Sequence, residues 1–174
     1  MTSLTADPTH PQDFLTVGLA QIAPVWLDRQ QTIVKVADHM LAAAERGCDL
    51  VTFGEALIPG YPFWIERPDG ARFNDPRQKE IFSLYLDQGV QIERGDLDPL
   101  CEIAKARQMA VYVGCMERAP DRGGHSLYCS LVHITRDGRI ASVHRKLQPT
   151  YEERLAWSPG DGHGLRVHAM EAFT

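Results

Sequence analysis

The chain has 174 residues, slightly more than one average domain, so a single core is favoured over two full domains. Its composition, 44% apolar and 24% charged, is that of an ordinary globular protein and excludes a disordered, collagen-like or coiled-coil chain. Eighteen Lys and Arg residues stand against 23 Asp and Glu, a net charge of −5 with no basic stripe. This balance argues against nucleic acid as a partner, because phosphate-backbone binding needs clustered positive charge.

The four cysteines are far apart in the sequence, and they form none of the Cys-x-x-Cys pairs that are typical of zinc or redox sites. They are Cys48, Cys101, Cys115 and Cys129. We expect all four to be reduced thiols. The histidines do not fall at zinc-ligand spacings with any cysteine, so no metal site is predicted.

The N-terminal segment, residues 1–13, carries no Lys or Arg and no apolar run long enough for a signal sequence. It is expected to be a flexible leader, followed by one domain over residues 14–174. No later apolar run approaches the roughly 20 residues that span a bilayer. These features predict a cytoplasmic protein without membrane contact.

The first half of the chain predicts a strand, a helix and a second strand. Residues 15–22 are short, apolar and rich in β-branched side chains, which is typical of a buried strand. Helical spacing of apolar residues follows over 29–46, with Asp28 as the predicted N-cap and Gly47 as the stop signal. A second buried strand is predicted over 49–53.

The second half predicts two helices and three strands. In order, we expect a helix opened by Asp75-Pro76 with Ile81, Phe82, Leu84, Tyr85 and Leu86 on its apolar face, a helix opened by Asp98-Pro99, and strands over 109–116, 127–135 and 140–146. The dipeptide Asp137-Gly138 predicts a hairpin, so the last two strands should be antiparallel neighbours. Residues 165–174 resemble the start of another strand. The order predicts an α/β (α+β) fold with a mixed sheet covered by helices on at least one side.

Two charged residues occupy equivalent places in the predicted sheet. Glu55 follows the second strand, and Lys146 follows the fifth. Ligands of open α/β sheets bind at the carboxyl ends of strands, so these side chains can converge on one site. From spacing alone, a buried or rim salt bridge is the favoured interpretation, and the motifs around these residues change that weighting.

Several separate motifs, in the same order, resemble the nitrilase branch of the carbon–nitrogen hydrolase superfamily. They are residues 53–62 (Phe-Gly-Glu-Ala-Leu-Ile-Pro-Gly-Tyr-Pro), 112–114, 126–129, 144–154 (His-Arg-Lys-Leu-Gln-Pro-Thr-Tyr-Glu-Glu-Arg), Trp157 and 160–162. Two departures are visible: Gly54 stands where many members have proline, and Ser158-Pro159 replaces a dipeptide that usually contains glycine.

The resemblance implies an α-β-β-α sandwich, of which this chain would be the N-terminal portion, incomplete at the C-terminus. It implies Glu55 as the general base, Lys146 as the cation that stabilises the tetrahedral intermediate, and Glu153 as a second carboxylate. Glu152 is the competitor for that last role, and the sequence leaves the choice open. The resemblance implies no organic cofactor and no metal.

The family's nucleophile is a cysteine that follows the lysine and the next strand, but no cysteine follows Cys129 in this chain. The four cysteines present fit inert core thiols better, because their predicted positions are within or beside regular elements. The 174-residue chain alone is therefore expected to be inactive.

In its complete form, the protein is expected to hydrolyse a nitrile to a carboxylic acid and ammonia through a cysteine thioimidate and a thioester. The alternatives are an amidase of the same superfamily and a non-catalytic binding or assembly module that retains the half-fold. The expected partners are a small nitrile or amide substrate and further copies of the chain in a homo-oligomer. Tyr61, Phe63 and Trp64 suggest an aromatic entrance to the substrate site.

Overall fold

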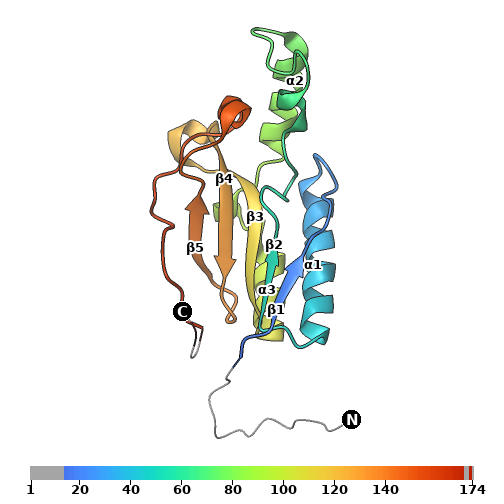
Figure 1. The fold of residues 1–174 in the computed structure, drawn as a ribbon, viewed down its shortest axis with the longest axis vertical. Helices are drawn as coiled ribbons and strands as arrows, with labels where there is room; N and C mark the ends of the chain where they lie inside the picture. Colours follow the sequence, from blue (N-terminus) through green and yellow to red (C-terminus); the bar gives the residue numbers. More distant parts are fainter. Residues whose placement is uncertain (1–13, 171–172, 174) are drawn as a thin grey trace, which may run out of the picture.

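A computed structural model describes residues 14–170 and 173; the predicted leader over 1–13 lies outside these residues. The described residues form one five-stranded sheet with the strands in chain order (Figure 1). The strands are β1 (Val17–Ala20), β2 (Leu50–Phe53), β3 (Ala110–Arg118), β4 (Leu127–Ile134) and β5 (Ile140–Arg145). β1, β2 and β3 are mutually parallel, while β4 is antiparallel to both β3 and β5. The predicted β4–β5 hairpin is thereby confirmed.

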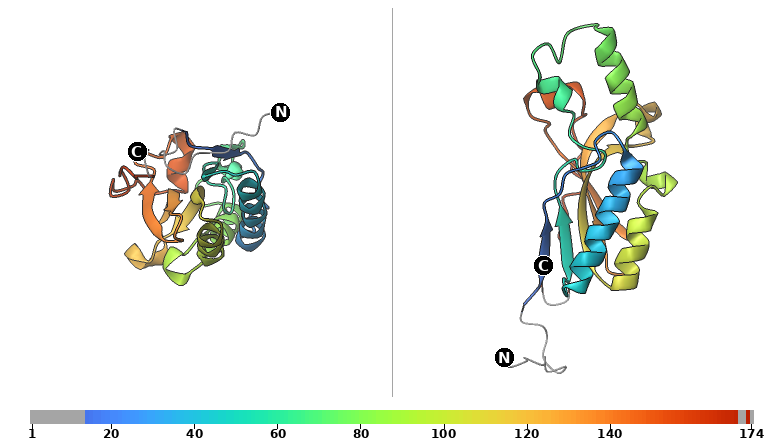
Figure 2. Two further views of the ribbon diagram at one scale, coloured as in Figure 1. Left: turned by 90° about the horizontal axis from the view of Figure 1, so that it is seen from below. Right: turned by 90° about the vertical axis from the view of Figure 1, so that its right-hand side faces the viewer.

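The helices are α1 (Arg29–Glu45), α2 (Pro76–Asp87) and α3 (Asp98–Arg107). As predicted, Asp28 caps α1 by accepting a hydrogen bond from the Gln31 amide at 2.9 Å. Asp75 caps α2 in the same way, at 2.8 Å from the Arg77 amide. Figure 2 shows that α1 and α3 lie side by side on one face of the sheet, whereas α2 extends beyond the sheet. None of the described helices has the length and hydropathy needed to cross a membrane.

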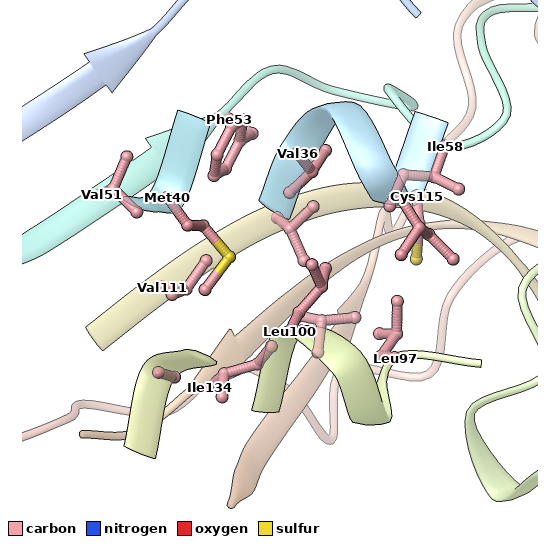
Figure 3. Packing of buried hydrophobic residues seen from close by; sticks show 14 of the residues in the cluster. Val36, Met40, Val51, Phe53, Ile58, Leu97, Leu100, Val111, Cys115 and Ile134 are labelled. Carbon is pink, nitrogen blue, oxygen red and sulfur yellow. The ribbon is translucent and has the colours of Figure 1, made fainter. Parts of the chain in front are cut away.

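The main core lies between this helical layer and the sheet (Figure 3). Val36 and Met40 of α1 and Leu100 of α3 are completely buried against strand residues such as Val111 of β3 and Ile134 of β4. Full burial of a side chain of this size stabilises the fold by about 1.5–3 kcal/mol. The helical face of the sheet is therefore fixed by packing, and the carboxyl ends of the strands are held in place.

Three details of the prediction are wrong. Residues 15–22 were expected to form a buried strand, but β1 covers only Val17–Ala20, and Val17 and Leu19 are exposed because the helices cover only the other face of the sheet. Leu84 was expected on the buried face of α2, but it is exposed, because α2 extends past the sheet and only Tyr85 is fully buried there.

Residues 165–174 were expected to begin a strand. Among those described, the only pairing is an isolated bridge between Met170 and Phe173; His168 contacts the edge strand β5 through a side-chain hydrogen bond with Ser142 at 2.8 Å instead of a strand ladder.

The second face of the sheet carries an unusual histidine. His133 on β4 is 3% exposed, it stacks on Tyr112 of β3 with ring centroids 4.5 Å apart, and its centroid is 4.3 Å from that of His168. Neither ring nitrogen has a hydrogen-bond partner in the described part of the chain. Burial, with a smaller contribution from His168, lowers the pKa of His133 from 6.5 to about 4. The ring is therefore neutral in the folded protein at neutral pH.

This shift predicts a stability that falls in mild acid. The contribution of neutral His133 to the free energy of unfolding is fully present above pH 6.5. It is lost as the pH falls toward 4, because His133 in the unfolded chain binds a proton at a higher pH than His133 in the folded chain. At about 1.4 kcal/mol per pKa unit, the loss is at most about 3 kcal/mol. Urea unfolding at pH 4 to 7 should show this slope in the wild type and a flatter one in His133→Phe. His125→Phe, at an exposed position, should retain the wild-type slope; equal slopes in all three proteins would contradict the prediction.

Candidate active site

Glu55 reaches the centre of the sheet because the chain crosses over β3 directly after β2. Gly114 of β3 permits the crossing: a Cβ atom there would lie 2.2 Å from the Gly54 carbonyl oxygen. The Ile58 amide then donates to the Gly114 carbonyl at 3.3 Å. Gly54, one of the two departures from the motif, has open space around its Cβ position. The Glu55 side chain is consequently directed toward β4 and β5.

Lys146 directly follows β5, and its backbone is held on both sides. Its amide donates to the Cys129 carbonyl of β4 at 2.8 Å, and its carbonyl accepts from the Gly160 amide at 3.0 Å. Its ammonium nitrogen lies 2.7 Å from Glu55 Oε1. The structure thus brings together the two residues that the sequence placed at the carboxyl ends of β2 and β5.

Glu153 lies in a short 3-10 helix, η4 (Tyr151–Leu155), and completes the cluster. Its carboxylate accepts from Lys146 Nζ at 2.9 and 3.2 Å and from the Thr150 amide at 2.6 Å. The Thr150 side chain in turn caps the Glu153 amide, which makes a reciprocal capping box. Glu152, the competitor left open by the sequence, is exposed. The geometry therefore selects Glu153 as the carboxylate beside Lys146.

Lys146 and Glu153 stabilise each other's ionised forms. Burial lowers the pKa of Lys146, but the hydrogen bonds that its ammonium donates to Glu55 and Glu153 outweigh this and raise the pKa overall. Burial raises the pKa of Glu153, but the Thr150 amide and the Lys146 ammonium lower it overall. At neutral pH the Lys146 ammonium therefore lies beside the Glu153 carboxylate.

A pocket of about 400 Å³ opens over this cluster. It is lined by Thr52, Phe53, Glu55, Gly114, Cys129, Ser130, Leu131, His144 and Lys146. The Cys129 thiol lies 3.5 Å from Glu55 Oε1, the oxygen that also accepts from Lys146. Burial, followed by the negative charge of Glu55, raises the pKa of Cys129 well above that of a free thiol. Cys129 is therefore protonated, and it contributes a donor rather than a thiolate.

Aromatic side chains pack beside the cluster of Glu55, Lys146 and Glu153. The Trp157 indole lies under Lys146, 5.9 Å from Nζ to the ring centroid, and donates to the Tyr85 hydroxyl at 3.1 Å. The expected aromatic entrance is different in the structure: Tyr61, Phe63 and Trp64 contact other aromatic rings, and none of them lines the pocket. Of these three, only Tyr61 approaches the cluster, with its hydroxyl 3.4 Å from Glu153 Oε1.

Sequence reasoning missed the place of Cys129 beside Glu55. A signal for this position was present in the sequence. A tight turn at Asp137-Gly138 pairs β4 with β5 so that Cys129 lies beside Lys146. The approach of Tyr61 to Glu153 had no such signal, because Tyr61 lies in an irregular loop. Among residues 14–170 and 173, no three His, Cys, Asp or Glu side chains gather in a way that could hold a metal ion.

Known proteins resemble this chain in sequence. The sequence profile of the carbon–nitrogen hydrolase family matches residues 16–172. A protein named Nitrilase 2 from an unknown prokaryotic organism is 40% identical over 154 residues, which are 88% of this chain and 47% of that protein. An aliphatic nitrilase from Rhodococcus rhodochrous is 32% identical, over 88% of this chain and 40% of its own length. The chain thus spans about half the length of the curated relatives it matches.

Solved structures show the same fold. An amidase from Nesterenkonia sp. AN1, in complex with acrylamide, superposes with a TM-score of 0.60 at 20% identity, covering 84% of this chain and 48% of the amidase. A carbon–nitrogen hydrolase from Helicobacter pylori G27 gives a TM-score of 0.60 at 21% identity, covering 84% of this chain and 45% of that protein. With the family profile matched along nearly its whole length, the chain belongs to the carbon–nitrogen hydrolase family.

Proposed function

We propose that this chain supplies the general base and the cationic group of a nitrilase that converts a nitrile to a carboxylic acid and ammonia. The observation that carries the proposal is the position of Lys146, whose ammonium contacts Glu55 and Glu153 at the mouth of a pocket. A salt bridge that only stabilises the fold would have no need of an open pocket or of a second, buried carboxylate.

The reaction requires a cysteine nucleophile, which in this family follows the lysine and which we place outside residues 1–174. Glu55 takes the thiol proton as the sulfur attacks the nitrile carbon, and the nitrile nitrogen gains a proton to form a thioimidate. Water adds to the thioimidate carbon, ammonia leaves and a thioester remains. A second water hydrolyses the thioester, which releases the acid and restores the thiol. Lys146 stabilises the negative charge at each addition.

Two alternatives remain beside the nitrilase. An amidase of the same family would use the same three residues, and the solved structures that match include amidases. Names of the relatives that are 32% to 40% identical favour nitriles over amides. A non-catalytic binding module is the less favoured alternative, because such a module would not need an ion cluster facing a pocket. The four free cysteines fit a reducing compartment such as the cytoplasm.

A matched substrate pair tests the proposal. The complete protein, in which this chain is joined to the cysteine-bearing half, should release ammonia from benzonitrile or from an aliphatic nitrile faster than from the amide of the same acid. Ammonia and the carboxylic acid are measured together. Faster turnover of the amide would support the amidase, and no turnover of either class across a broad panel would support the binding module.

The 174-residue chain alone is the negative control for this assay. We expect no ammonia release above background, because no cysteine follows Cys129 and the Cys129 thiol is buried and protonated. Turnover by the isolated chain that disappears in Glu55→Gln would contradict the assignment of the nucleophile. Cys129→Ser would then show whether Cys129 had been misjudged.

A further inference from the structure

A buried ion pair lies on the opposite side of β5 from the candidate active site. The Glu117 side chain on β3 is only 3% exposed, and both of its oxygens are occupied. Arg145 of β5 donates to it twice, from Nη2 to Oε1 at 2.7 Å and from Nε to Oε2 at 2.9 Å. The Ser130 hydroxyl on β4, between the two strands, donates to Oε2 at 2.6 Å. The pair therefore connects β3, β4 and β5 across the sheet.

Further groups fix the Arg145 guanidinium from its other sides. Its central carbon lies 4.0 Å from the centre of the Tyr128 ring, a cation–π contact. Its Nη1 lies 3.2 Å from Asp161 and 3.5 Å from Asp121. Hydrogen bonding to Glu117 outweighs burial and raises the pKa of Arg145. The guanidinium is thus held in one orientation by groups from four segments of the chain.

The Glu117–Arg145 pair lies at the carboxyl end of β5, directly before Lys146. Among the described strands β5 pairs only with β4, so it is an edge strand that is paired on only one side at its carboxyl end. Lys146 is the first residue after that end. Because side chains alternate along an extended chain, Arg145 and Lys146 point to opposite faces, and Arg145 can be held without touching the pocket. The backbone of Gly160 packs directly against the end of β5: a Cβ atom at Gly160 would lie 2.3 Å from the Arg145 carbonyl oxygen.

We propose that the Glu117–Arg145 pair is a positioning device for Lys146: it fixes the end of β5 so that the ammonium lies between Glu55 and Glu153. The inference rests on the function proposed above for Lys146. A gain in folding stability is a poor explanation of the pair, because the cost of removing two charges from water offsets their attraction. Two apolar side chains of similar size would stabilise the fold about equally. A bidentate arginine instead fixes the orientation of the strand end, and a reacting group such as Lys146 requires a fixed orientation.

The reactivity of the Lys146 amine tests this without any turnover. In the 174-residue chain, limiting acetic anhydride labels each lysine in proportion to its unprotonated fraction and access, and peptide mass spectrometry reports each site. In Arg145→Lys and in Glu117→Gln, Lys146 should leave its carboxylates, its pKa should fall, and its labelling should rise by about threefold or more. Exposed Lys105 is the internal reference and should not change.

Arg139→Ala is the matched control, since Arg139 lies on the same hairpin but pairs with Asp137 at the surface. It should leave Lys146 labelling at the wild-type level. The proposal is overturned if both pair variants also match the wild type, or if the labelling of Lys105 rises together with that of Lys146, which would indicate general loosening. Because labelling needs no catalysis, a failed nitrilase assay would leave this result intact, and an unaltered Lys146 would leave the proposed function intact.

Discussion

Replacing Lys146 by methionine should reduce turnover of the complete protein by about 10²- to 10³-fold, the usual effect of removing a donor that stabilises charge developing in the transition state. Methionine keeps the length of the side chain but supplies no charge. The loss should fall on kcat more than on KM, because the ammonium acts on the tetrahedral intermediate more than on the bound nitrile. Steady-state kinetics with one nitrile measure both constants.

The companion change Glu55→Gln should lower turnover by about 10²- to 10⁴-fold, because the amide cannot accept the thiol proton. Glu152→Gln is the matched control: it makes the same change at an exposed neighbour of Glu153 and should leave turnover unaltered. Retention of wild-type turnover by either Lys146→Met or Glu55→Gln would show that the role of that residue is misassigned. Thermal unfolding of each variant verifies that the fold is intact.

The isolated chain should self-associate at micromolar concentration. Its helices cover one face of the sheet (Figure 2). Apolar side chains on the other face are exposed: Leu19 is 81% exposed, Val17 42% and Leu131 37%. At about 25 cal/mol per Å², even about 400 Å² of such surface corresponds to on the order of 10 kcal/mol of burial not yet realised. Sedimentation velocity should therefore show species larger than the 19.5 kDa monomer.

Charged substitutions on that face test the explanation. Leu19→Glu and Leu131→Glu should shift the chain toward monomer and reduce the binding of an apolar dye. Leu84→Glu, at an exposed leucine on α2, is the control and should not change the assembly. A wild-type monomer that unfolds cooperatively and binds no dye would show that these residues close their own core, and would favour the binding module over the enzyme.

The sequence predicted most of the sheet because its evidence is local. The Asp137-Gly138 turn determines that β4 and β5 are neighbours, and period and capping determine α1. From these alone, Glu55 and Lys146 could be placed at the same edge of the sheet, which the structure confirms by a 2.7 Å contact. Their catalytic roles remain predictions, since geometry does not measure chemistry.

What escaped prediction depends on contacts between distant segments. The path of Glu55 across β3 depends on the missing side chain of Gly114, which no periodic pattern reveals. Leu84 fits the apolar spacing of α2, but spacing does not show that the helix extends past the sheet. Likewise, the pairing of Glu117 with Arg145 requires the order of three strands, which is known only once the sheet is formed.

The reciprocal cap at Thr150 and Glu153 has a dynamic consequence. One oxygen of Glu153 accepts from both the Thr150 amide and the Lys146 ammonium, so the turn and the charge cluster share a single atom. When η4 opens, the lysine loses a carboxylate, and when the lysine is removed, the turn loses a charged neighbour. Amide hydrogen exchange at the start of η4 and the ionisation of Lys146 should consequently report one and the same opening event.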